Sequence, residues 1–186
     1  MADSKLEQHY KAYIEINYDG DPPDNHIQRM LNTSANEGDL KLLDYTIKEK
    51  NASVNVEEGK NSALNYAAEG GSVLAGKRLL EYGAEINHQG KDGNTSLHVA
   101  SDEGKTEFVA LLLAAGADVT MTNKNGETAL DISKENPYQL DTQLLLKDAE
   151  QGIRPTWDEL GMKPPLRKKS MAEHAVRNSS SDLPGH

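Results

Sequence analysis

Residues 91–123 read KDGNTSLHVASDEGKTEFVALLLAAGADVTMTN, and residues 58–90, EGKNSALNYAAEGGSVLAGKRLLEYGAEINHQG, follow the same pattern without a gap. The matching positions of the two blocks are Leu97 with Leu64, Ala100 with Ala67, Gly104 with Gly71, Leu112-Leu113 with Leu79-Leu80, and Gly116 with Gly83. Leu130, Leu145 and Leu146 continue the pattern at the same spacing of 33 residues. A period of this length indicates a solenoid of stacked units rather than one closed core.

Each block predicts a turn, a short helix, a tight glycine turn, a longer helix and a Gly-Ala loop. In residues 91–123, Thr95 or Ser96 is suited to begin the first helix as its N-cap. Gly104 breaks the chain after this helix, and Gly116 ends the second helix as a C′ glycine. Between these glycines runs the apolar stripe of the second helix: Phe108, Val109, Leu112 and Leu113.

Residues 95–100, TSLHVA, together with Gly104 and residues 111–119, resemble the ankyrin repeat, whose signature is T-P-L-H-x-A. Ser96 replaces the usual proline. The resemblance covers about residues 25–152, in four units of which the outer two are atypical: 25–57, 58–90, 91–123 and 124–152. It implies an all-α ankyrin-repeat α-solenoid of about four helix-turn-helix repeats with hairpin-like loops. We expect residues 1–24 to be an N-terminal extension and residues 153–186 a mostly disordered, flexible tail, because four prolines and a serine run interrupt the latter.

Two features depart from the repeat pattern. Asp141 and Thr142 fall where the third unit has Phe108 and Val109, which predicts a rotated or shifted final helix whose apolar positions are Leu140, Leu144 and Leu145. Gly76 stands in a helix interior, where it costs about 1 kcal/mol relative to alanine. We therefore expect the middle of the solenoid to be less stable than an ideal array.

The composition excludes several classes of function. The chain has a net charge of −10 and no cysteine, so disulfides and cysteine-based zinc sites are absent, and direct binding to nucleic acid is disfavoured. Its most apolar stretch, residues 108–117, is too short to span a membrane, and the first residues lack the apolar segment of a signal peptide. We therefore expect a cytoplasmic or nuclear protein that does not bind membranes and is a monomer.

No catalytic constellation emerges from the sequence. His98, Ser101 and Asp102 lie one helical turn apart, but a triad also needs converging geometry and an oxyanion site. In the ankyrin family the signature histidine hydrogen-bonds between neighbouring loops, which is the role that the resemblance implies for His98. The other histidines show no metal-ligand spacing. The sequence predicts neither an enzyme nor a cofactor or metal site.

The resemblance implies a concave binding face built from the exposed sides of the first helices and the fingertip loops. Two positions before each helix-helix turn point into it: Asn36 and Glu37, Glu69 and Gly70, Asp102 and Glu103, and Glu135 and Asn136. Five of these eight residues are acidic and none is basic. The fingertips add Glu57, Glu58 and Asn61, then Lys91, Asp92 and Asn94, then Lys124, Asn125 and Glu127.

These residues predict a non-catalytic protein-protein interaction module, an adaptor or scaffold that binds a basic segment of another protein. The alternative is a regulatory or inhibitory subunit that blocks the site of one specific enzyme. Acidic residues on exposed helix faces also occur simply because they keep a protein solvated, and the sequence leaves that interpretation open.

The C-terminal region and one loop carry further candidates. Trp157, the only tryptophan, either packs on the last repeat or forms, with Leu160, a W-x-x-L motif that resembles those of autophagy adaptors; Thr156 and Glu159 fit a capping box before it. Asn87 ends an L-x5-E-I-N stretch that resembles the motif hydroxylated in many ankyrin proteins, although an asparagine here can also cap its loop. Residues 167–170, RKKS, resemble a kinase site at Ser170 or a nuclear-import signal, and this basic run could cover the acidic face.

Overall fold

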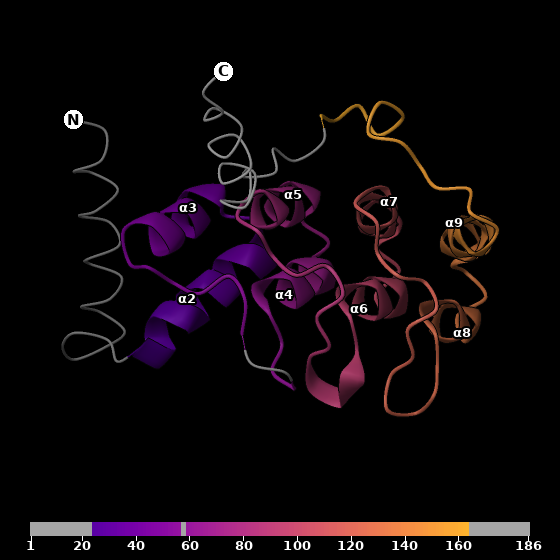
Figure 1. Cartoon of the computed structure of the whole chain (residues 1–186), viewed down its shortest axis with the longest axis horizontal. Coiled ribbons are helices and arrows are strands. Elements are labelled where there is room, and N and C mark those ends of the chain that lie inside the picture. The colour runs from indigo at the N-terminus through magenta and orange to yellow at the C-terminus, as the bar shows by residue number, and fades with distance from the viewer. Residues whose placement is uncertain (1–23, 57–58, 164–186) are drawn as a thin grey trace, which may run out of the picture.

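The computed structural model describes residues 24–56 and 59–163, which form four stacked helix-turn-helix repeats in two layers (Figure 1). The first helices of the repeats, which make one layer, are α2 (Asp24–Glu37), α4 (Ala63–Gly70), α6 (Ser96–Asp102) and α8 (Ala129–Lys134). The second helices, which make the other layer, are α3 (Leu40–Lys48), α5 (Val73–Glu81), α7 (Thr106–Ala114) and α9 (Leu140–Glu150). The predicted all-α solenoid is confirmed.

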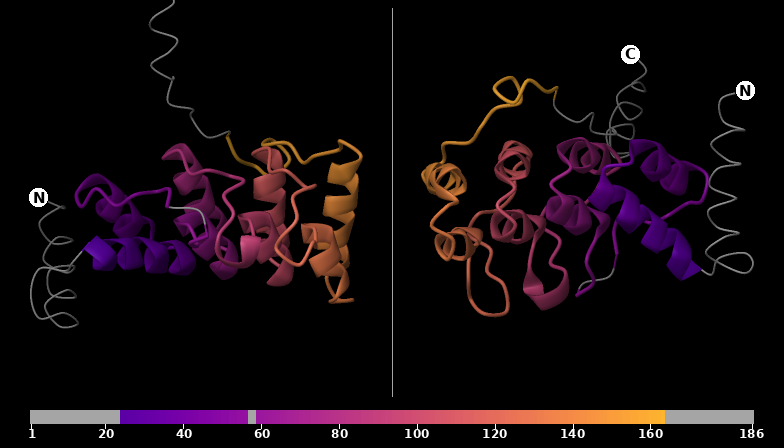
Figure 2. Two further views of the ribbon diagram at one scale, coloured as in Figure 1. Left: turned by 60° about the horizontal axis from the view of Figure 1, so that its bottom comes forward. Right: turned by 180° about the vertical axis from the view of Figure 1, so that it is seen from behind.

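Each helix packs against the helix of the same layer in the next repeat, so the core is continuous along the stack. Long loops join the repeats on the side of the first helices, and one of them contains the 3-10 turn η1 (Lys91–Gly93) (Figures 1 and 2). No helix within the described ranges is both long and apolar enough to cross a bilayer.

Local sequence fixes where the first helices begin. Ser62 caps α4 in a capping box with Asn65, and Thr128 caps α8 in a capping box with Asp131. Each side chain satisfies a backbone N–H that the helix itself leaves free. The helices therefore start three residues after the tip of each loop, which places the same repeat position on the same face of every unit.

The densest part of the core surrounds α7. Every residue from Phe108 to Leu113 is buried, because α5 and α9 flank this helix on both sides. A Cβ atom at Gly76 of α5 would lie 2.6 Å from the ring of Phe108. The glycine that the sequence marks as unfavourable for a helix thus lets a buried ring pack directly on the α5 backbone.

The prediction for the last helix is wrong in its details. α9 keeps the register of the repeat and buries Thr142, whose Oγ1 lies 2.8 Å from Oγ1 of Thr106. Leu140 and Leu144, predicted as inward-facing, are 59% and 49% exposed. The paired hydroxyls satisfy each other, so a threonine can occupy the core position that Val109 fills in the third repeat.

Residues 153–163, which we call the C-terminal strap, run back from α9 over the second helices (Figures 1 and 2). Nη1 of Arg154 donates hydrogen bonds to the carbonyl oxygens of Leu113 (3.3 Å) and Ala117 (2.7 Å) at the end of α7. Trp157 and Met162 are partly buried and pack against the core. This segment therefore extends the folded unit beyond residue 152, while residues 164–186 lie outside the described part of the chain.

Candidate functional site

The exposed side of the first helices, the first-helix face, carries the predicted row of carboxylates. We call five of its residues the acidic ladder: Glu37, Glu69, Asp102, Glu103 and Glu135. All five are exposed, and Asn36 beside them is half-buried. Within the described residues none of the five forms an ion pair. Their negative charge is therefore not neutralised by the protein itself.

Acidic side chains on the second-helix side are arranged differently. Asp44 of α3 forms an ion pair with Nη1 of Arg78 and accepts a hydrogen bond from the hydroxyl of Tyr82 at 2.7 Å. Nε of Arg78 also lies 3.4 Å from Glu81. The hydrogen bond to Asp44 raises the pKa of Arg78 above its usual range. This network joins the first two repeats, so these carboxylates serve the fold.

A pocket of about 320 Å³ opens on the first-helix face between α2 and α4. Its lining residues are Arg29, Asn32, Thr33, Asn36, Glu37, Tyr66 and Glu69. The helices approach closely here, because a Cβ atom at Gly70 would lie 1.9 Å from the carbonyl oxygen of Asn36. Gly70, which the sequence places on the binding face, thus serves the contact between repeats instead.

The pocket reveals a row that the sequence analysis missed. Thr33, Tyr66, Val99 and Ile132 occupy the same position in the four repeats, and we call them the central row. The last three are half-buried, and Tyr66 and Val99 pack against the core. Their spacing of 33 residues was a usable signal, but only neighbouring repeats show that these side chains remain partly exposed beside the ladder.

The fingertip candidates divide into two groups. Asn61 Oδ1 accepts a hydrogen bond from the backbone N–H of Lys91 (2.8 Å), and the carbonyl of Asn94 accepts from Gly90 and Asn65. At the equivalent position, Glu127 accepts from the side chains of Asn123 and Asn125, which lowers the pKa of its carboxyl group. These three residues hold the loops in shape.

The remaining fingertip residues are exposed and available to a partner: Lys91, Asp92, Lys124 and Asn125. They carry mixed charge, so the acidic character of the face comes from the helices. Glu57 and Glu58 lie outside the described residues.

His98 links two repeats. Its Nε2–H donates to the carbonyl oxygen of Glu127 (3.1 Å), and its Nδ1 accepts from the backbone N–H (3.2 Å) and the hydroxyl (2.7 Å) of Thr95. Burial lowers the pKa of His98, which keeps the ring neutral. Since both ring nitrogens are engaged, neither activates Ser101, and the loop-bridging role predicted for His98 has the contacts that it requires.

Asn87 is exposed, yet its Oδ1 accepts a hydrogen bond from the backbone N–H of Asp118 at 2.9 Å. Asn55 makes the same bond to Glu85 in the preceding repeat. The side chain thus has the contacts of a loop cap, and its hydroxylation stays a prediction. Within the described ranges, no cluster of His, Asp and Glu side chains could hold a metal ion.

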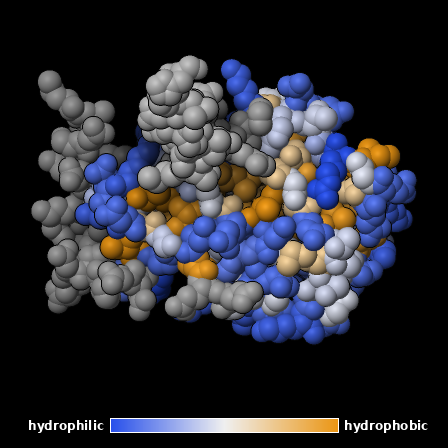
Figure 3. Space-filling view, viewed as in Figure 1, coloured by the Kyte–Doolittle hydropathy of each residue, from blue (hydrophilic) through white to orange (hydrophobic). Residues whose placement is uncertain are grey.

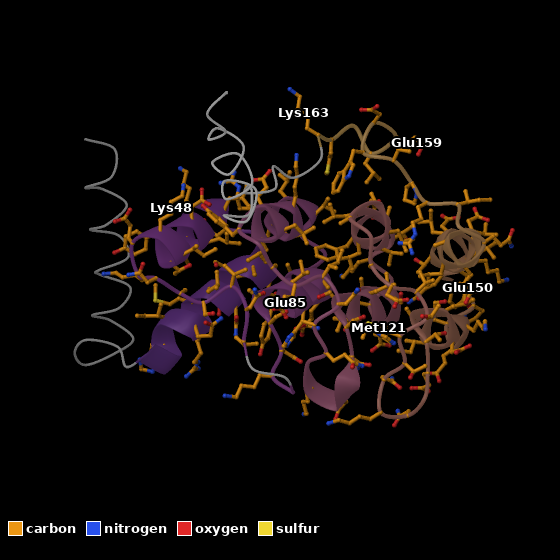
Figure 4. The ribbon with its side chains drawn as sticks, viewed as in Figure 1. Lys48, Glu85, Met121, Glu150, Glu159 and Lys163 are labelled. Atoms are coloured by element: carbon orange, nitrogen blue, oxygen red, sulfur yellow. The ribbon has the colours of Figure 1, made fainter. Side chains whose placement is uncertain are left out.

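The strap candidates lie on the opposite side from the loops. Thr156 and Glu159 form the predicted capping box, with Glu159 accepting from the backbone N–H of Thr156 at 2.7 Å. Leu160 is half-buried, and Glu159 and Lys163 sit above the second helices (Figure 4). A partner that reads Trp157 and Leu160 as a linear motif would have to detach Trp157 from the core. Ser170 lies outside the described residues.

Comparison with known proteins agrees with this geometry. A search of curated proteins gave no significant match. A family model for ankyrin repeats in three copies matches residues 31–123 and 77–157, more than half of the chain. Ankyrin repeats are general protein-protein interaction modules, and the family is generally non-catalytic. The chain therefore belongs to the ankyrin-repeat family.

Proposed function

We propose that this protein is a monomeric, non-catalytic adaptor or scaffold of the cytoplasm or nucleus that binds a basic segment of another protein on its first-helix face. The acidic ladder carries the proposal. It supplies at least one exposed carboxylate from every repeat, and these carboxylates have no ion-pair partner among the described residues. Complementary charge on a partner would speed association and make it sensitive to salt.

The charge balance supports a protein partner over nucleic acid. Phosphate backbones are held by clustered lysine and arginine side chains, and the first-helix face offers the opposite charge. The exposed fingertip residues Lys91, Asp92, Lys124 and Asn125 form a mixed rim beside the ladder. Such a polar rim around a more selective centre is typical of protein interfaces.

The test compares two variants with the same change in net charge. The ladder variant combines Glu69→Gln, Asp102→Asn and Glu103→Gln. The control variant combines Glu107→Gln, Asp141→Asn and Glu150→Gln, which are exposed acidic residues of the second helices. Each immobilised protein is exposed to cell extract at low salt, and the retained proteins are identified after elution with salt.

We expect one or more stoichiometric partners to bind the wild type and the control variant but not the ladder variant. Retention of the same partners by the ladder variant would contradict the proposal. If the partner is an enzyme whose activity falls when the protein is added, the protein is an inhibitory subunit rather than an adaptor.

A further inference from the structure

Building on the proposed function, we infer that the partner segment is an extended chain in the polyproline II conformation with a basic residue at every third position. We further infer that one of these residues is an arginine that enters the pocket beside Tyr66. The observations behind this inference are the spacing of the repeats, the polar lining of the pocket and the central row.

The spacing of the repeats selects the conformation of the partner. Packed helices lie about 8–10 Å apart, so the ladder presents carboxylates at about this interval along the stack. A polyproline II chain has three residues per turn and rises about 3.1 Å per residue, which puts residues on one side about 9 Å apart. In a β-strand, residues on one side repeat at about 7 Å and fall out of phase with the repeats.

The pocket lining favours an extended chain over a helix. Asn32, Thr33 and Asn36 offer amide and hydroxyl groups that both donate and accept hydrogen bonds. A polyproline II chain has no internal hydrogen bonds, so its backbone N–H and C=O groups can use these partners. An α-helix satisfies its backbone internally and would leave the amides of the pocket unused.

The ring of Tyr66 favours arginine at the position that enters the pocket. Glu37 and Glu69 lie on the same pocket as Arg29, so the charge of the lining is only weakly negative. Charge alone therefore does not select the occupant. A half-buried aromatic ring adds a flat surface on which a guanidinium group stacks, whereas a lysine ammonium group is compact and more strongly hydrated.

The central row explains why the intervening residues matter as well. Val99 and Ile132 continue the half-buried surface of Tyr66 into the third and fourth repeats. Small apolar residues or prolines between the basic positions would pack on this row while the basic side chains reach the ladder. The partner segment thus alternates one basic residue with two small or apolar ones.

The experiment uses labelled synthetic peptides of about nine residues, all composed of arginine, proline and alanine in equal numbers. One peptide places arginine at every third position, a second at every second position, and a third groups the arginines together. A fourth, alanine-rich helical peptide spaces its arginines by seven residues. Fluorescence anisotropy with the full-length protein, at low and physiological salt, measures each dissociation constant.

We expect the peptide with arginine at every third position to bind at least about fivefold tighter than the two rearranged peptides. Equal binding of the three would overturn the inference and leave the proposed function standing. Tighter binding of the helical peptide would also overturn it. If none of the basic peptides binds, the proposed function fails together with the inference.

A pair of tyrosine variants tests the pocket. Tyr66→Ala should weaken binding of the preferred peptide about fivefold and remove its preference for arginine over a lysine-containing copy. Tyr138→Ala is the control, because Tyr138 is 95% exposed in the loop before α9 and lies outside the pocket. An unchanged preference in Tyr66→Ala would show that the pocket does not read the partner.

Discussion

At the residue scale, one position of the repeat performs the same task with three different side chains. Asn65, His98 and Asp131 each accept a hydrogen bond from the backbone N–H of the residue that caps their helix. Asn65 and His98 also donate to a carbonyl oxygen in the loop of the next repeat. Asp131 cannot donate and instead pairs with Lys134, whose hydrogen bond lowers the pKa of Asp131 to about 2.

This equivalence yields a prediction for pH. Burial lowers the pKa of His98 below its ordinary value of 6.5, so the unfolded chain takes up a proton on this side chain before the folded chain does. The free energy of unfolding therefore falls as the pH drops below about 6.5, and a tenfold difference in proton affinity is worth about 1.4 kcal/mol. His98→Asn, which copies Asn65, should fold and lose part of this dependence between pH 7 and 5. Urea unfolding at several pH values measures it, and an identical pH profile for both proteins would contradict the assignment.

A second residue-scale prediction concerns Gly76. In an isolated helix Gly76→Ala would gain about 1 kcal/mol, but here the new methyl group meets Phe108 at 2.6 Å and Leu111 at 2.9 Å. Overpacking of this kind costs about 1–3 kcal/mol, so we expect a net loss of stability in urea unfolding. Repeating the substitution in a Phe108→Leu background should make it neutral or stabilising. The same loss in both backgrounds would mean that the ring is not the cause.

These residues show what a sequence reveals at this scale. The family resemblance was sufficient to predict the bridging role of His98, since the signature fixes both its helix and its neighbours. Gly76 was interpreted only through helix propensity, because nothing in the sequence shows which side chain of the next repeat fills the space above it. Tyr66 was overlooked for the same reason, as its exposure depends on α2 and α4 together.

At the scale of elements, the C-terminal strap is held at one end by Arg154 and farther along by Trp157. Arg154 satisfies carbonyl groups that α7 leaves free at its C-terminus, and it adds a positive charge where the helix dipole is negative. The strap was counted with the tail in the sequence because its prolines and polar residues resemble those of a linker. The tertiary contacts that fix it come from residues 37–41 positions earlier in the chain.

The strap gives a prediction that uses the only tryptophan. Arg154→Ala should free the strap, shift the fluorescence of Trp157 to longer wavelength and increase its quenching by acrylamide, while the helical circular dichroism stays unchanged. Lys163→Ala is the control, because Lys163 is exposed at the end of the strap. Unchanged fluorescence in Arg154→Ala would show that Trp157 holds the strap without the arginine.

At the scale of the whole molecule, the two sides of the stack differ in character. The first-helix side presents unpaired carboxylates and long loops, and the second-helix side carries paired charges and the strap. Apolar residues reach the surface in patches between the two layers (Figure 3). The basic run of residues 167–170 follows a strap that ends on the second-helix side, so covering the acidic ladder would require the chain to pass around the edge of the stack.

The overall architecture was predictable because a period of 33 residues specifies each unit and its neighbours at once. The number of repeats, the two layers and the position of the ladder all follow from it. The orientation of α9 was not predictable from apolar positions, since a pair of hydrogen-bonded threonines replaced the expected apolar contact. The strap and the pocket depend on contacts between units, which a single repeat does not encode.

The bridge made by His98 also has a mechanical consequence. A stack of repeats under tension separates where the contact between two units is weakest, and each contact here has its own chemistry. Protonation of His98 would cost the hydrogen bonds from Thr95 that orient the ring, and would leave a charge in a buried site between the third and fourth repeats. Mild acid should therefore turn this one junction into the fracture point, so that α8 and α9 peel away from a stack that otherwise stays intact.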